Sequence, residues 1–460
     1  MILKSTLIQP GAKIGVVGLG ITGKAAVRYI QACGAVAHVS DLREQQRFLE
    51  DEGKFLEKSN VRWEAGGHTE KFLQAMDLIL VSPGIHPKMP LLQNLSEMGV
   101  PVMGELALAA DLLKVPVVGI TGTNGKTTVT TILGHIFKEA GMRPFVGGNI
   151  GNPLYYYLLC PDSYDILVLE LSSFQLEACH GFAPDYGLLL NVSPDHLDWH
   201  GSMSAYETAK MNLFMNQSPD QYAILSEELI TGQDPQFTGK GSVYSFGNGN
   251  HNRAKVDRDC VLLKLEDSEE EYRYRDYGQI RGVNRSNFAA AILTAHLYGL
   301  HKEEISRGLR SFSFLPHRLE YVDRVADVSY YNDSKATNTG AVIAALQHFD
   351  GNVVLIAGGR DKGDDYTLLR QAVAEKVVAL VLLGEAAELL ASALADLTAV
   401  SRVYSMEQAV SAASQLAAPG GTVILSPGCA SFDMFTSYGH RGNEFKKEVA
   451  RLKLQHNAQA

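Results

Sequence analysis

Short, mostly apolar segments, each followed by a glycine-containing turn and then by a helical pattern, recur along this chain and constrain its fold more than any other feature. Lys13–Val17, Val115–Ile120 and Val353–Ala357 are three of them. Strands this apolar are buried on both faces, which is the situation of strands in a parallel sheet covered by helices. The sequence therefore predicts an α/β fold.

Composition excludes several classes of protein. The formal net charge of −10 argues against a nucleic-acid-binding protein, which usually carries a basic face. The longest uncharged apolar run, Val377–Gly384, is far shorter than the about 20 residues needed to cross a bilayer. The first residues lack the pattern of a signal peptide, and the five cysteines form no C-x-x-C pair. We therefore expect a cytoplasmic protein with reduced thiols, no membrane insertion and no nucleic-acid partner.

The first glycine-rich turn is Gly18-x-Gly20-x-x-Gly23, and Asp41 ends the next predicted strand. In nucleotide-binding α/β domains such glycines permit a tight turn that brings the N–H groups of a helix N-terminus to a phosphate. A tight turn without a ligand is the alternative interpretation. The glycines leave open which phosphate-bearing ligand binds.

A second glycine-rich turn, Thr121–Thr128 (TGTNGKTT), follows the strand that ends at Ile120. Its glycines would let successive backbone N–H groups face an anion, Lys126 would reach the terminal phosphates, and the Thr127 hydroxyl could bind Mg²⁺. The spacing differs from that of the common P-loop, because Ile120 stands where the first glycine should be. The strand–turn–helix context still predicts a site for a nucleoside triphosphate.

Further polar residues follow other predicted strands. Glu170 ends the strand Asp165–Leu171, and a carboxylate beside a phosphate loop is a suitable ligand for Mg²⁺. His196 follows the strand Tyr186–Val192, where a purely structural histidine is the alternative. Lys210 lies on the next helix and on its own would be taken for a surface charge.

In the C-terminal third, Asn332–Asn338 packs small, polar and charged residues between a strand and a helix. This pattern is typical of ligand binding at the carboxyl edge of a sheet. The alternative is a capping turn with Asp333 or Ser334 as the helix N-cap. Lys362 and Ser426–Tyr438 follow two more strands.

The strand–helix alternation pauses twice, and a length of 460 residues suits about three domains. We expect three α/β domains in series. Residues 1–103 would form a Rossmann-like domain, residues 104–314 a P-loop-type ATPase domain with a mostly parallel sheet, and residues 315–460 a second Rossmann-like domain.

These motifs, in this order along nearly the whole chain, resemble the Mur ligases, ATP-dependent enzymes that build the peptidoglycan stem peptide. The resemblance rests on the phosphate loop, on Glu170 in LELSSFQLE, on Asn191–His196 and on Lys210. Within the family, the chain is similar to the branch that adds D-glutamate. This similarity rests on the GLGITG turn and on the LPHR, DSKATN and RGNEF motifs.

The resemblance implies a cytoplasmic, monomeric ligase that joins D-glutamate to UDP-N-acetylmuramoyl-L-alanine with ATP and two Mg²⁺ ions. The substrate carboxylate would attack the γ-phosphate to give an acyl phosphate, and the amine would displace phosphate through a tetrahedral intermediate. The implied catalytic residues are Lys126, Glu170, His196 and Lys210. Thr127, Glu170, His196 and a carbamylated Lys210 would be the metal ligands.

Carbamylation of Lys210 also has a physical rationale. An ammonium group about 4 Å from a divalent ion would be repelled by roughly 8 kcal/mol at an effective dielectric constant near 20. The carbamate is instead an anionic oxygen ligand of the kind that Mg²⁺ prefers.

The resemblance implies three sets of binding residues. Those for ATP are Gly122, Thr123, Asn124, Gly125, Lys126, Thr127, Thr128, Asn284, Asn287, Arg318, Asp333 and Lys335. Those for the UDP substrate are Gly20, Ile21, Thr22, Asp41, Leu42, Arg43, Ser82, Pro83, Gly84, Asn149 and His196. Those for D-glutamate are Thr337, Lys362, Ser431, Phe432 and Tyr438.

Three alternatives remain open at this point. A sister Mur-type ligase would add another amino acid. An NAD-dependent oxidoreductase could use the first glycine motif, but it would leave the phosphate loop and Glu170 without a role. A binding protein that uses ATP as a conformational switch would hydrolyse ATP without forming an amide bond.

Overall fold

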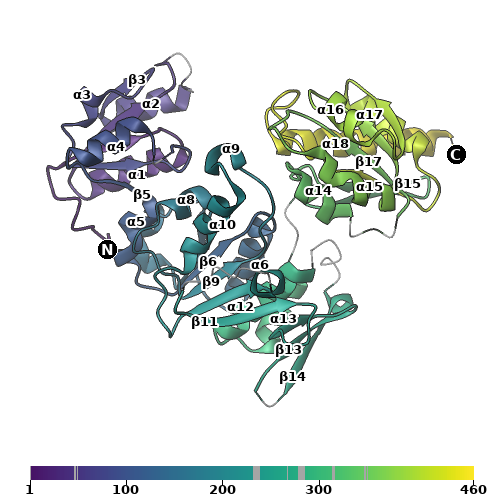
Figure 1. The fold of residues 1–460 in the computed structure, drawn as a ribbon, viewed down its shortest axis with the longest axis horizontal. Helices are drawn as coiled ribbons and strands as arrows, with labels where there is room; N and C mark the ends of the chain where they lie inside the picture. Colours follow the sequence, from purple (N-terminus) through teal and green to yellow (C-terminus); the bar gives the residue numbers. More distant parts are fainter. Residues whose placement is uncertain are drawn as a thin grey trace. The chain divides into compact units, whose positions relative to one another are not determined.

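The computed structural model describes residues 2–45, 48, 50–86, 88–231, 239–266, 268–277, 285–312, 316–346, 349 and 351–459. Within these residues the strands form three sheets, each flanked by helices (Figure 1). Contacts divide the chain into two compact units, the first holding the first two sheets and the second holding the third. The predicted α/β fold with mostly parallel sheets is confirmed.

The N-terminal sheet has five parallel strands in the order β3-β2-β1-β4-β5. Its central strand, KIGVV, is buried at every position after the first, because helices cover both faces. The elements are β1 (Lys13–Val17), α1 (Ile21–Ala32), β2 (Val36–Asp41), α2 (Glu50–Ser59), β3 (Arg62–Ala65), α3 (Glu70–Leu73), β4 (Leu78–Val81), α4 (Pro90–Glu97) and β5 (Val102–Gly104).

The central sheet has nine strands in the order β14-β13-β12-β11-β10-β9-β6-β8-β7. All neighbours pair in parallel except β12 with β13 and β13 with β14. The strands are β6 (Val117–Thr121), β7 (Pro144–Gly148), β8 (Ile166–Glu170), β9 (Tyr186–Leu189), β10 (Tyr222–Ser226), β11 (Ser242–Gly247), β12 (Ala254–Val256), β13 (Cys260–Lys264) and β14 (Glu269–Arg273). The helices are α5 (Glu105–Ala109), α6 (Lys126–Glu139), α7 (Tyr155–Leu159), α8 (Ser173–Glu177), α9 (Leu197–His200), α10 (Met203–Met211), α11 (Glu227–Thr231), α12 (Arg285–Leu297) and α13 (Lys302–Ser311).

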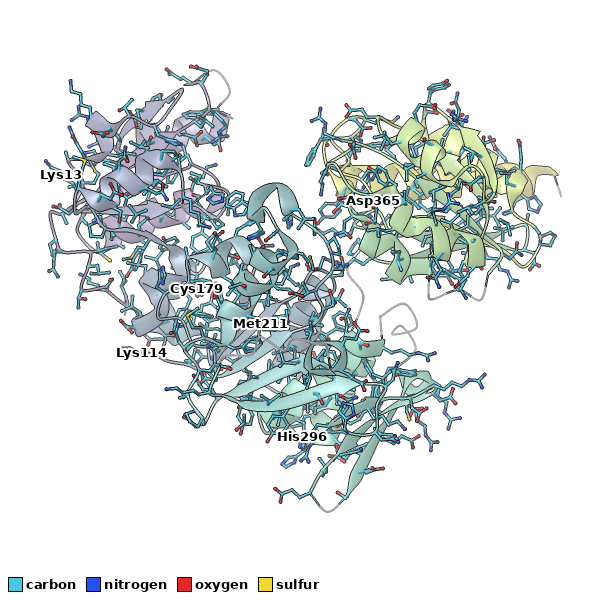
Figure 2. All side chains as sticks on the ribbon, viewed as in Figure 1. Lys13, Lys114, Cys179, Met211, His296 and Asp365 are labelled. Atoms are coloured by element: carbon cyan, nitrogen blue, oxygen red, sulfur yellow. The ribbon has the colours of Figure 1, made fainter. Side chains whose placement is uncertain are left out.

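The hydrophobic core of the first unit contains residues from both of its sheets and their helices. Cys179 is buried within this core and Met211 packs against it; both are labelled in Figure 2. All five cysteines are free thiols in this structure.

The C-terminal sheet has the order β15-β16-β20-β17-β18-β19, with β15 antiparallel to β16 and all other pairs parallel. The strands are β15 (Glu320–Val325), β16 (Val328–Asn332), β17 (Val353–Ala357), β18 (Val377–Leu382), β19 (Ala399–Arg402) and β20 (Thr422–Leu425). The helices are α14 (Thr339–Leu346), α15 (Arg370–Lys376), α16 (Ala387–Leu394), α17 (Met406–Leu416) and α18 (Tyr438–Gln459).

The alternative interpretation of the DSKATN motif, a capping turn at Asp333 or Ser334, is wrong. The helix after the DSKATN motif begins at Thr339, so neither Asp333 nor Ser334 caps it. Asn338 has that role, since its side-chain oxygen accepts a hydrogen bond from Ala341 N at 2.8 Å.

No helix within the described ranges is both long enough and apolar enough to span a membrane.

Candidate active site

The loop between β6 and α6 forms an open anion-binding turn. Gly122 and Gly125 have φ angles of 151° and 85°, which favour glycine. Gly125 is the N-cap of the 14-residue helix α6, and no side chain makes a capping hydrogen bond there. By contrast, Ser202 caps α10 with its hydroxyl. The first N–H groups of α6 therefore face a ligand position, and the helix dipole favours an anion there.

Two lysines converge on this loop. Lys126 Nζ donates to the carbonyl oxygens of Gly122 at 2.7 Å and Thr123 at 2.8 Å, and Lys210 Nζ donates to the same Gly122 oxygen at 2.9 Å. The two ammonium groups therefore lie within about 6 Å of each other, which costs roughly 3 kcal/mol at an effective dielectric constant near 20. Lys210 is only 1% exposed, so it is not the surface charge that its sequence context suggests. A bound anion, or neutralisation of one lysine, would remove this repulsion.

Glu170 meets the loop from the neighbouring strand β8. Its Oε2 accepts a hydrogen bond from Thr127 Oγ1 at 2.6 Å, and its Oε1 accepts one from Asn149 Nδ2 at 2.9 Å. Glu170 is 2% exposed. The parallel pairing of β8 with β6 and with β7 brings these three predicted residues together at one edge of the sheet.

The donor set at Thr127 and Glu170 suits Mg²⁺. A hydroxyl and a carboxylate are hard oxygen ligands, and Mg²⁺ usually takes one or two carboxylates and completes its shell with substrate phosphates and water. Across the part of the chain that the structure describes, no three His, Cys, Asp or Glu side chains gather into an all-protein metal cage. The residues present therefore fit a magnesium ion that is shared with a nucleotide.

Asn191, which the sequence-based list of binding residues omits, holds the loop in place. Its backbone oxygen accepts from Thr123 N at 3.0 Å, its Oδ1 accepts from Asn124 N at 2.9 Å, and its Nδ2 donates to Asn124 O at 3.1 Å. Tyr206 adds a hydroxyl–hydroxyl contact of 3.1 Å with Thr123. The position of Asn191, directly after a buried strand, was the signal that could have identified it.

His196 has a strained backbone. Its φ of 54° and ψ of 32° place a non-glycine residue in the left-handed region, which costs on the order of 1–3 kcal/mol and often marks functional positions. Its ring contacts that of Phe174, with centroids 4.8 Å apart. The strain and the aromatic packing fix the direction of the imidazole.

Asn284 and Asn287 are two of the residues predicted to bind ATP, and Asn287 closely approaches the phosphate loop. A Cβ atom added at Gly125 would lie 2.5 Å from both amide atoms of Asn287. The other one, Asn284, lies outside the described residues.

The Gly18–Gly23 turn of the N-terminal domain is as tight as the motif predicts. A Cβ at Gly23 would lie 2.0 Å from the Gly18 carbonyl oxygen, whereas a Cβ at Gly20 would meet nothing within 4 Å. Gly20 is the N-cap of α1, again without a side-chain cap. Ser82 Oγ donates to Gly18 O at 3.0 Å and ties the strand β4 to the turn. Space and N–H groups for a phosphate therefore lie at Gly20.

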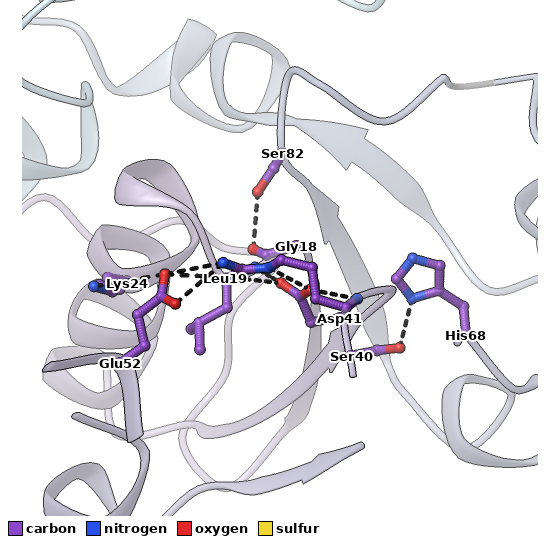
Figure 3. Close-up of polar contacts among 9 residues, drawn as sticks. Gly18, Leu19, Lys24, Ser40, Asp41, Glu52, His68 and Ser82 are labelled. Carbon is purple, nitrogen blue, oxygen red and sulfur yellow. Dashed lines mark hydrogen bonds and ion pairs between the residues drawn. The ribbon is translucent and has the colours of Figure 1, made fainter. Parts of the chain in front are cut away.

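Asp41 is engaged on both carboxylate oxygens (Figure 3). Leu19 N donates to its Oδ2 at 2.7 Å, Arg43 N and Nε donate to its Oδ1 at 2.9 Å, and Arg43 Nη2 donates to Oδ2 at 3.0 Å. Arg43 also pairs with Glu52 at 3.1 Å. Burial works to raise the pKa of Asp41, but the hydrogen bonds from Arg43 and Leu19 outweigh it and hold this pKa below its usual value. The carboxylate thus fixes the turn instead of standing free for a ribose hydroxyl.

The remaining residues predicted for the UDP substrate flank this turn. Ile21 and Leu42 are 70% and 71% exposed, unusual values for such apolar side chains. Thr22 and Pro83 are half-buried, and Gly84 is exposed.

In the second unit, the predicted residues other than Arg318 follow β16, β20 and β17, three neighbouring parallel strands. Arg360 and Ala430 exchange backbone hydrogen bonds of 2.8 and 3.2 Å, which joins the loop that carries Lys362 to the loop that carries Ser431. Ser431 is buried, whereas Lys362 is exposed. Predictions from separate stretches of sequence therefore meet at one sheet edge.

Of the other predicted residues of this unit, Lys335 and Thr337 follow β16, Phe432 and Tyr438 follow β20, and Arg318 precedes β15. Lys335 Nζ lies 4.0 Å from the ring centroid of Tyr438. Phe432 is 64% exposed, and Arg318 and Thr337 are half-buried.

Asp333 is a buried carboxyl group. Its Oδ1 accepts from Leu319 N at 3.1 Å and its Oδ2 accepts from Ser426 Oγ at 3.0 Å. Burial raises its pKa to about 7, more than these hydrogen bonds lower it.

Arg441, which sequence reasoning treated only as part of a family motif, is 1% exposed. Its Nε donates to Ser334 Oγ at 3.0 Å and its Nη2 to Ser334 O at 2.8 Å, while Nη1 donates to the carbonyl oxygens of Cys429 and Ala430 at 3.1 and 3.2 Å. The guanidinium thereby ties the DSKATN loop to the loop after β20.

Comparisons with known proteins agree with this arrangement. Three family models match in order: "Mur ligase MurD-like, N-terminal domain" over residues 12–104, "Mur ligase middle domain" over 120–295, and "Mur ligase, glutamate ligase domain" over 317–429. A UDP-N-acetylmuramoylalanine–D-glutamate ligase of Desulfotalea psychrophila is 46% identical over 457 residues, covering 98% of this chain and 99% of its own length. A ligase of the same name from Trichlorobacter lovleyi is 39% identical, covering 96% and 99%.

Solved structures show the same fold at low sequence identity. A pseudomurein peptide ligase type C from Methanothermus fervidus gives a TM-score of 0.60 at 18% identity, covering 96% of this chain and all of that one. MurF from Acinetobacter baumannii gives 0.60 at 16% identity, covering 97% and 91%. The identity to full-length relatives, together with the three matched domains, shows that this chain belongs to the Mur ligase family, among the UDP-N-acetylmuramoylalanine–D-glutamate ligases.

Proposed function

We propose that this chain is an ATP-dependent amide ligase that joins the L-alanyl carboxylate of UDP-N-acetylmuramoyl-L-alanine to the amine of D-glutamate, in peptidoglycan precursor synthesis. The observation that carries the proposal is the phosphate loop itself. Lys126 and Lys210 converge on Gly122 O, and the Thr127–Glu170 pair lies beside them. Family membership adds the reaction class and both substrates, since relatives 37–46% identical carry this name.

The chemistry balances in two steps. A substrate carboxylate oxygen bonds to the γ-phosphorus of ATP, and the bond to the β-phosphate oxygen breaks, giving an acyl phosphate and ADP. The amine of D-glutamate then attacks the acyl carbon, and the tetrahedral intermediate loses phosphate and a proton to leave an amide. Lys126 places its charge at the transferring phosphoryl group, which is most of what phosphoryl transfer needs from a protein.

Thr127 and Glu170 would hold a Mg²⁺ ion, which neutralises phosphate charge when bound. We propose a second ion held by His196 and a carbamylated Lys210. The carbamate would form when the neutral Lys210 amine adds to carbon dioxide and releases a proton. The carbamate is supported by the crowding of two ammonium groups at Gly122 O. Carbamylation would remove their repulsion, because it replaces one positive charge by a negative one.

For the N-terminal domain we propose the site of the uridine nucleotide, with phosphate at the open N-terminus of α1. Gly20, Ile21 and Thr22 would contact it there, with Asp41–Arg43 and Ser82–Gly84 around them. The saturated Asp41 carboxylate supports this assignment over an NAD site, where that carboxylate usually accepts from ribose.

Asn149 would complete this substrate site through its contact with Glu170, and His196 would face the same substrate. Asn287, Arg318, Asp333 and Lys335 would bind adenosine and phosphate.

For D-glutamate we propose the pocket formed by Thr337, Lys362, Ser431, Phe432 and Tyr438. Lys362 supplies a cation for one of the two carboxylates. We also propose a cytoplasmic monomer divided at residues 103/104 and 314/315. The free cysteines support a reducing compartment, and one chain carries residues for all three substrates.

One assay tests the reaction. The protein is incubated with ATP, Mg²⁺ and UDP-N-acetylmuramoyl-L-alanine, the amino acid is varied, and products are identified by mass. We expect a product only with D-glutamate. Product with another amino acid would assign a sister ligase activity, and ATP hydrolysis without any product would refute amide synthesis. Lys126→Ala should lower the rate at least 10²-fold.

The carbamate has its own test. Lys210→Ala should lose activity and regain part of it when a short-chain carboxylic acid is added, since the acid can occupy the space of the carbamate. Lys138→Ala, on the same domain, is the control. Full activity of Lys210→Ala would remove the second metal site from the proposal.

A further inference from the structure

The loop after β3 carries a polar network that the proposed reaction does not use. Ser40, at the end of β2, is fully buried, and its hydroxyl lies 2.7 Å from Glu64 Oε1. The same hydroxyl lies 2.7 Å from His68 Nδ1 (Figure 3). Thr69 donates its N–H to Glu64 Oε1 at 2.9 Å and its hydroxyl to Glu64 Oε2 at 2.6 Å. A serine, a carboxylate and a histidine are thus joined at the carboxyl edge of the N-terminal sheet.

The hydrogens of this network determine the tautomer of His68. Glu64 accepts three hydrogen bonds, so it acts as a carboxylate and has no proton to donate. The single hydrogen of the Ser40 hydroxyl is used toward Glu64. His68 Nδ1 must therefore donate to Ser40 Oγ, because two lone pairs cannot face each other at 2.7 Å. The other ring nitrogen, Nε2, is left as a hydrogen-bond acceptor.

The neutral form of this imidazole is favoured. Burial lowers the pKa of His68 more than the nearby charges of Asp41 and Glu64 raise it. The ring thus keeps a lone pair on Nε2 near neutral pH. Figure 3 shows that this nitrogen is directed away from Ser40.

Backbone contacts hold His68 beside the substrate-binding turn. Gly66 N donates to Arg43 O at 2.9 Å and Gly67 N to Asp41 O at 3.4 Å. Gly66 has a φ of 79°, which favours glycine, so the Gly66-Gly67 pair shapes the loop that presents the histidine. His68 lies in the loop that follows β3. In the strand order, β3 is next to β2 and at the edge of the sheet away from β4.

This side is where the base of a nucleotide is expected. In such sheets the phosphate sits at the first glycine turn, and the ribose and base extend over the ends of the following strands. Asp41 cannot read the base with its carboxylate, because both of its oxygens are occupied by Leu19 and Arg43. Leu42, 71% exposed, offers an apolar surface nearby in the sequence.

We propose that His68 Nε2 accepts a hydrogen bond from the N3–H group of the uracil ring and so selects uridine nucleotides over cytidine nucleotides. This inference rests on the proposed function, which places a UDP-linked substrate in this domain. Uracil has a hydrogen on N3, whereas cytosine has a lone pair there. A fixed acceptor therefore attracts the first base and repels the second. His68 is a specificity-determining residue, and Ser40 and Glu64 are positioning residues that act through it.

Calorimetric titration of the full chain with UDP, CDP and N3-methyl-UDP, without ATP, tests the proposal. We expect the wild-type protein to bind UDP about tenfold more tightly than either analogue, in line with one satisfied hydrogen bond. His68→Ala should bind UDP about tenfold more weakly and should no longer distinguish it from N3-methyl-UDP. Ser40→Ala, in which no hydroxyl fixes the tautomer, should lose part of the preference, although the buried Ser40 cannot reach a ligand.

The outcomes separate the two proposals. If the wild type makes the D-glutamate product and binds UDP but ranks N3-methyl-UDP equally, the role of His68 is overturned and the proposed function stands. Retention of the full preference in a folded His68→Ala variant has the same meaning. If the wild type binds no uridine nucleotide and makes no product, both proposals fail. The wild-type comparison needs no variant, so it decides the question even if His68→Ala does not fold.

Discussion

Gly125 offers the sharpest test of the phosphate-loop geometry, because a matched control lies at the other end of the same helix. Gly125 precedes α6 with a φ of 85°, and Gly141 follows it with a φ of 89°. An alanine at either position must adopt the left-handed region, at a cost of about 1–2 kcal/mol. The smaller entropy of the unfolded chain offsets both changes equally.

Only Gly125 has a close neighbour. Its added Cβ would lie 2.5 Å from Asn287 Nδ2 and Oδ1, whereas nothing lies within 4 Å of a Cβ at Gly141. Displacing the buried amide of Asn287 should add about 1–3 kcal/mol, the usual cost of overpacking. At roughly 2–4 °C per kcal/mol for a domain of this size, Gly125→Ala should lower the melting temperature by several degrees more than Gly141→Ala.

Thermal unfolding of both variants and of Gly125→Ala/Asn287→Ala measures the difference. The double variant should recover most of the overlap cost, since a smaller side chain at position 287 leaves room for the methyl group. In the same samples, calorimetric titration with ATP should show weaker binding for Gly125→Ala and wild-type binding for Gly141→Ala. Equal melting temperatures for the two single variants would refute the close approach of Asn287 to the loop.

Three further predictions follow from buried groups. Burial raises the pKa of Asp333 to about 7, so between about pH 4 and pH 7 this carboxyl is protonated in the folded chain but ionised in the unfolded chain. The wild type should therefore lose stability relative to Asp333→Asn as the pH rises through that range. Chemical denaturation at a series of pH values measures this loss. Arg441→Lys should cost about 2–4 kcal/mol of stability, because an ammonium cannot bridge Ser334 and Cys429 as the planar guanidinium does. It should also raise the KM for D-glutamate more than the KM for UDP-N-acetylmuramoyl-L-alanine. Equal changes in both KM values would argue against a role of Arg441 at the D-glutamate site. Gly308→Ala should lower the melting temperature, since its Cβ would lie 2.8 Å from the Ile136 Cα where α13 crosses α6, and an unchanged melting temperature would contradict this close packing.

Sequence could predict the elements whose signals are local. The strand before each glycine turn and the helix after it are defined by neighbouring residues, and α6 indeed begins at Lys126, within the TGTNGKTT motif. The antiparallel extension β12–β14 was less accessible, because its strands are short and its last strand, EEEYR, has a charged sequence. Glu269–Arg273 is a strand because it pairs in antiparallel register with Cys260–Lys264, and its own composition does not indicate a strand.

The site was predictable at the level of which strand ends meet, but not at the level of what each side chain contacts. Asp41 fits a ribose-binding pattern in sequence, and only the fold shows that Arg43 and Leu19 occupy its carboxylate. Asn191 contacts a loop 67 residues away in the chain. Such partners are set by strand order, which the local sequence does not encode.

Buried cations are the part of the site that sequence reasoning is least able to find, because lysine and arginine are almost always exposed. Arg441 illustrates what burial achieves. Among the described residues its guanidinium bonds to carbonyl and hydroxyl oxygens and forms no ion pair, and burial lowers its pKa to about 10. Neutral partners satisfy its hydrogens without cancelling its charge, and a charge kept out of water is screened less. The second unit therefore carries a fixed positive potential beside Ser431, where we place a dicarboxylate substrate. The attraction between the buried guanidinium and the bound anion then offsets the desolvation cost of burying the guanidinium.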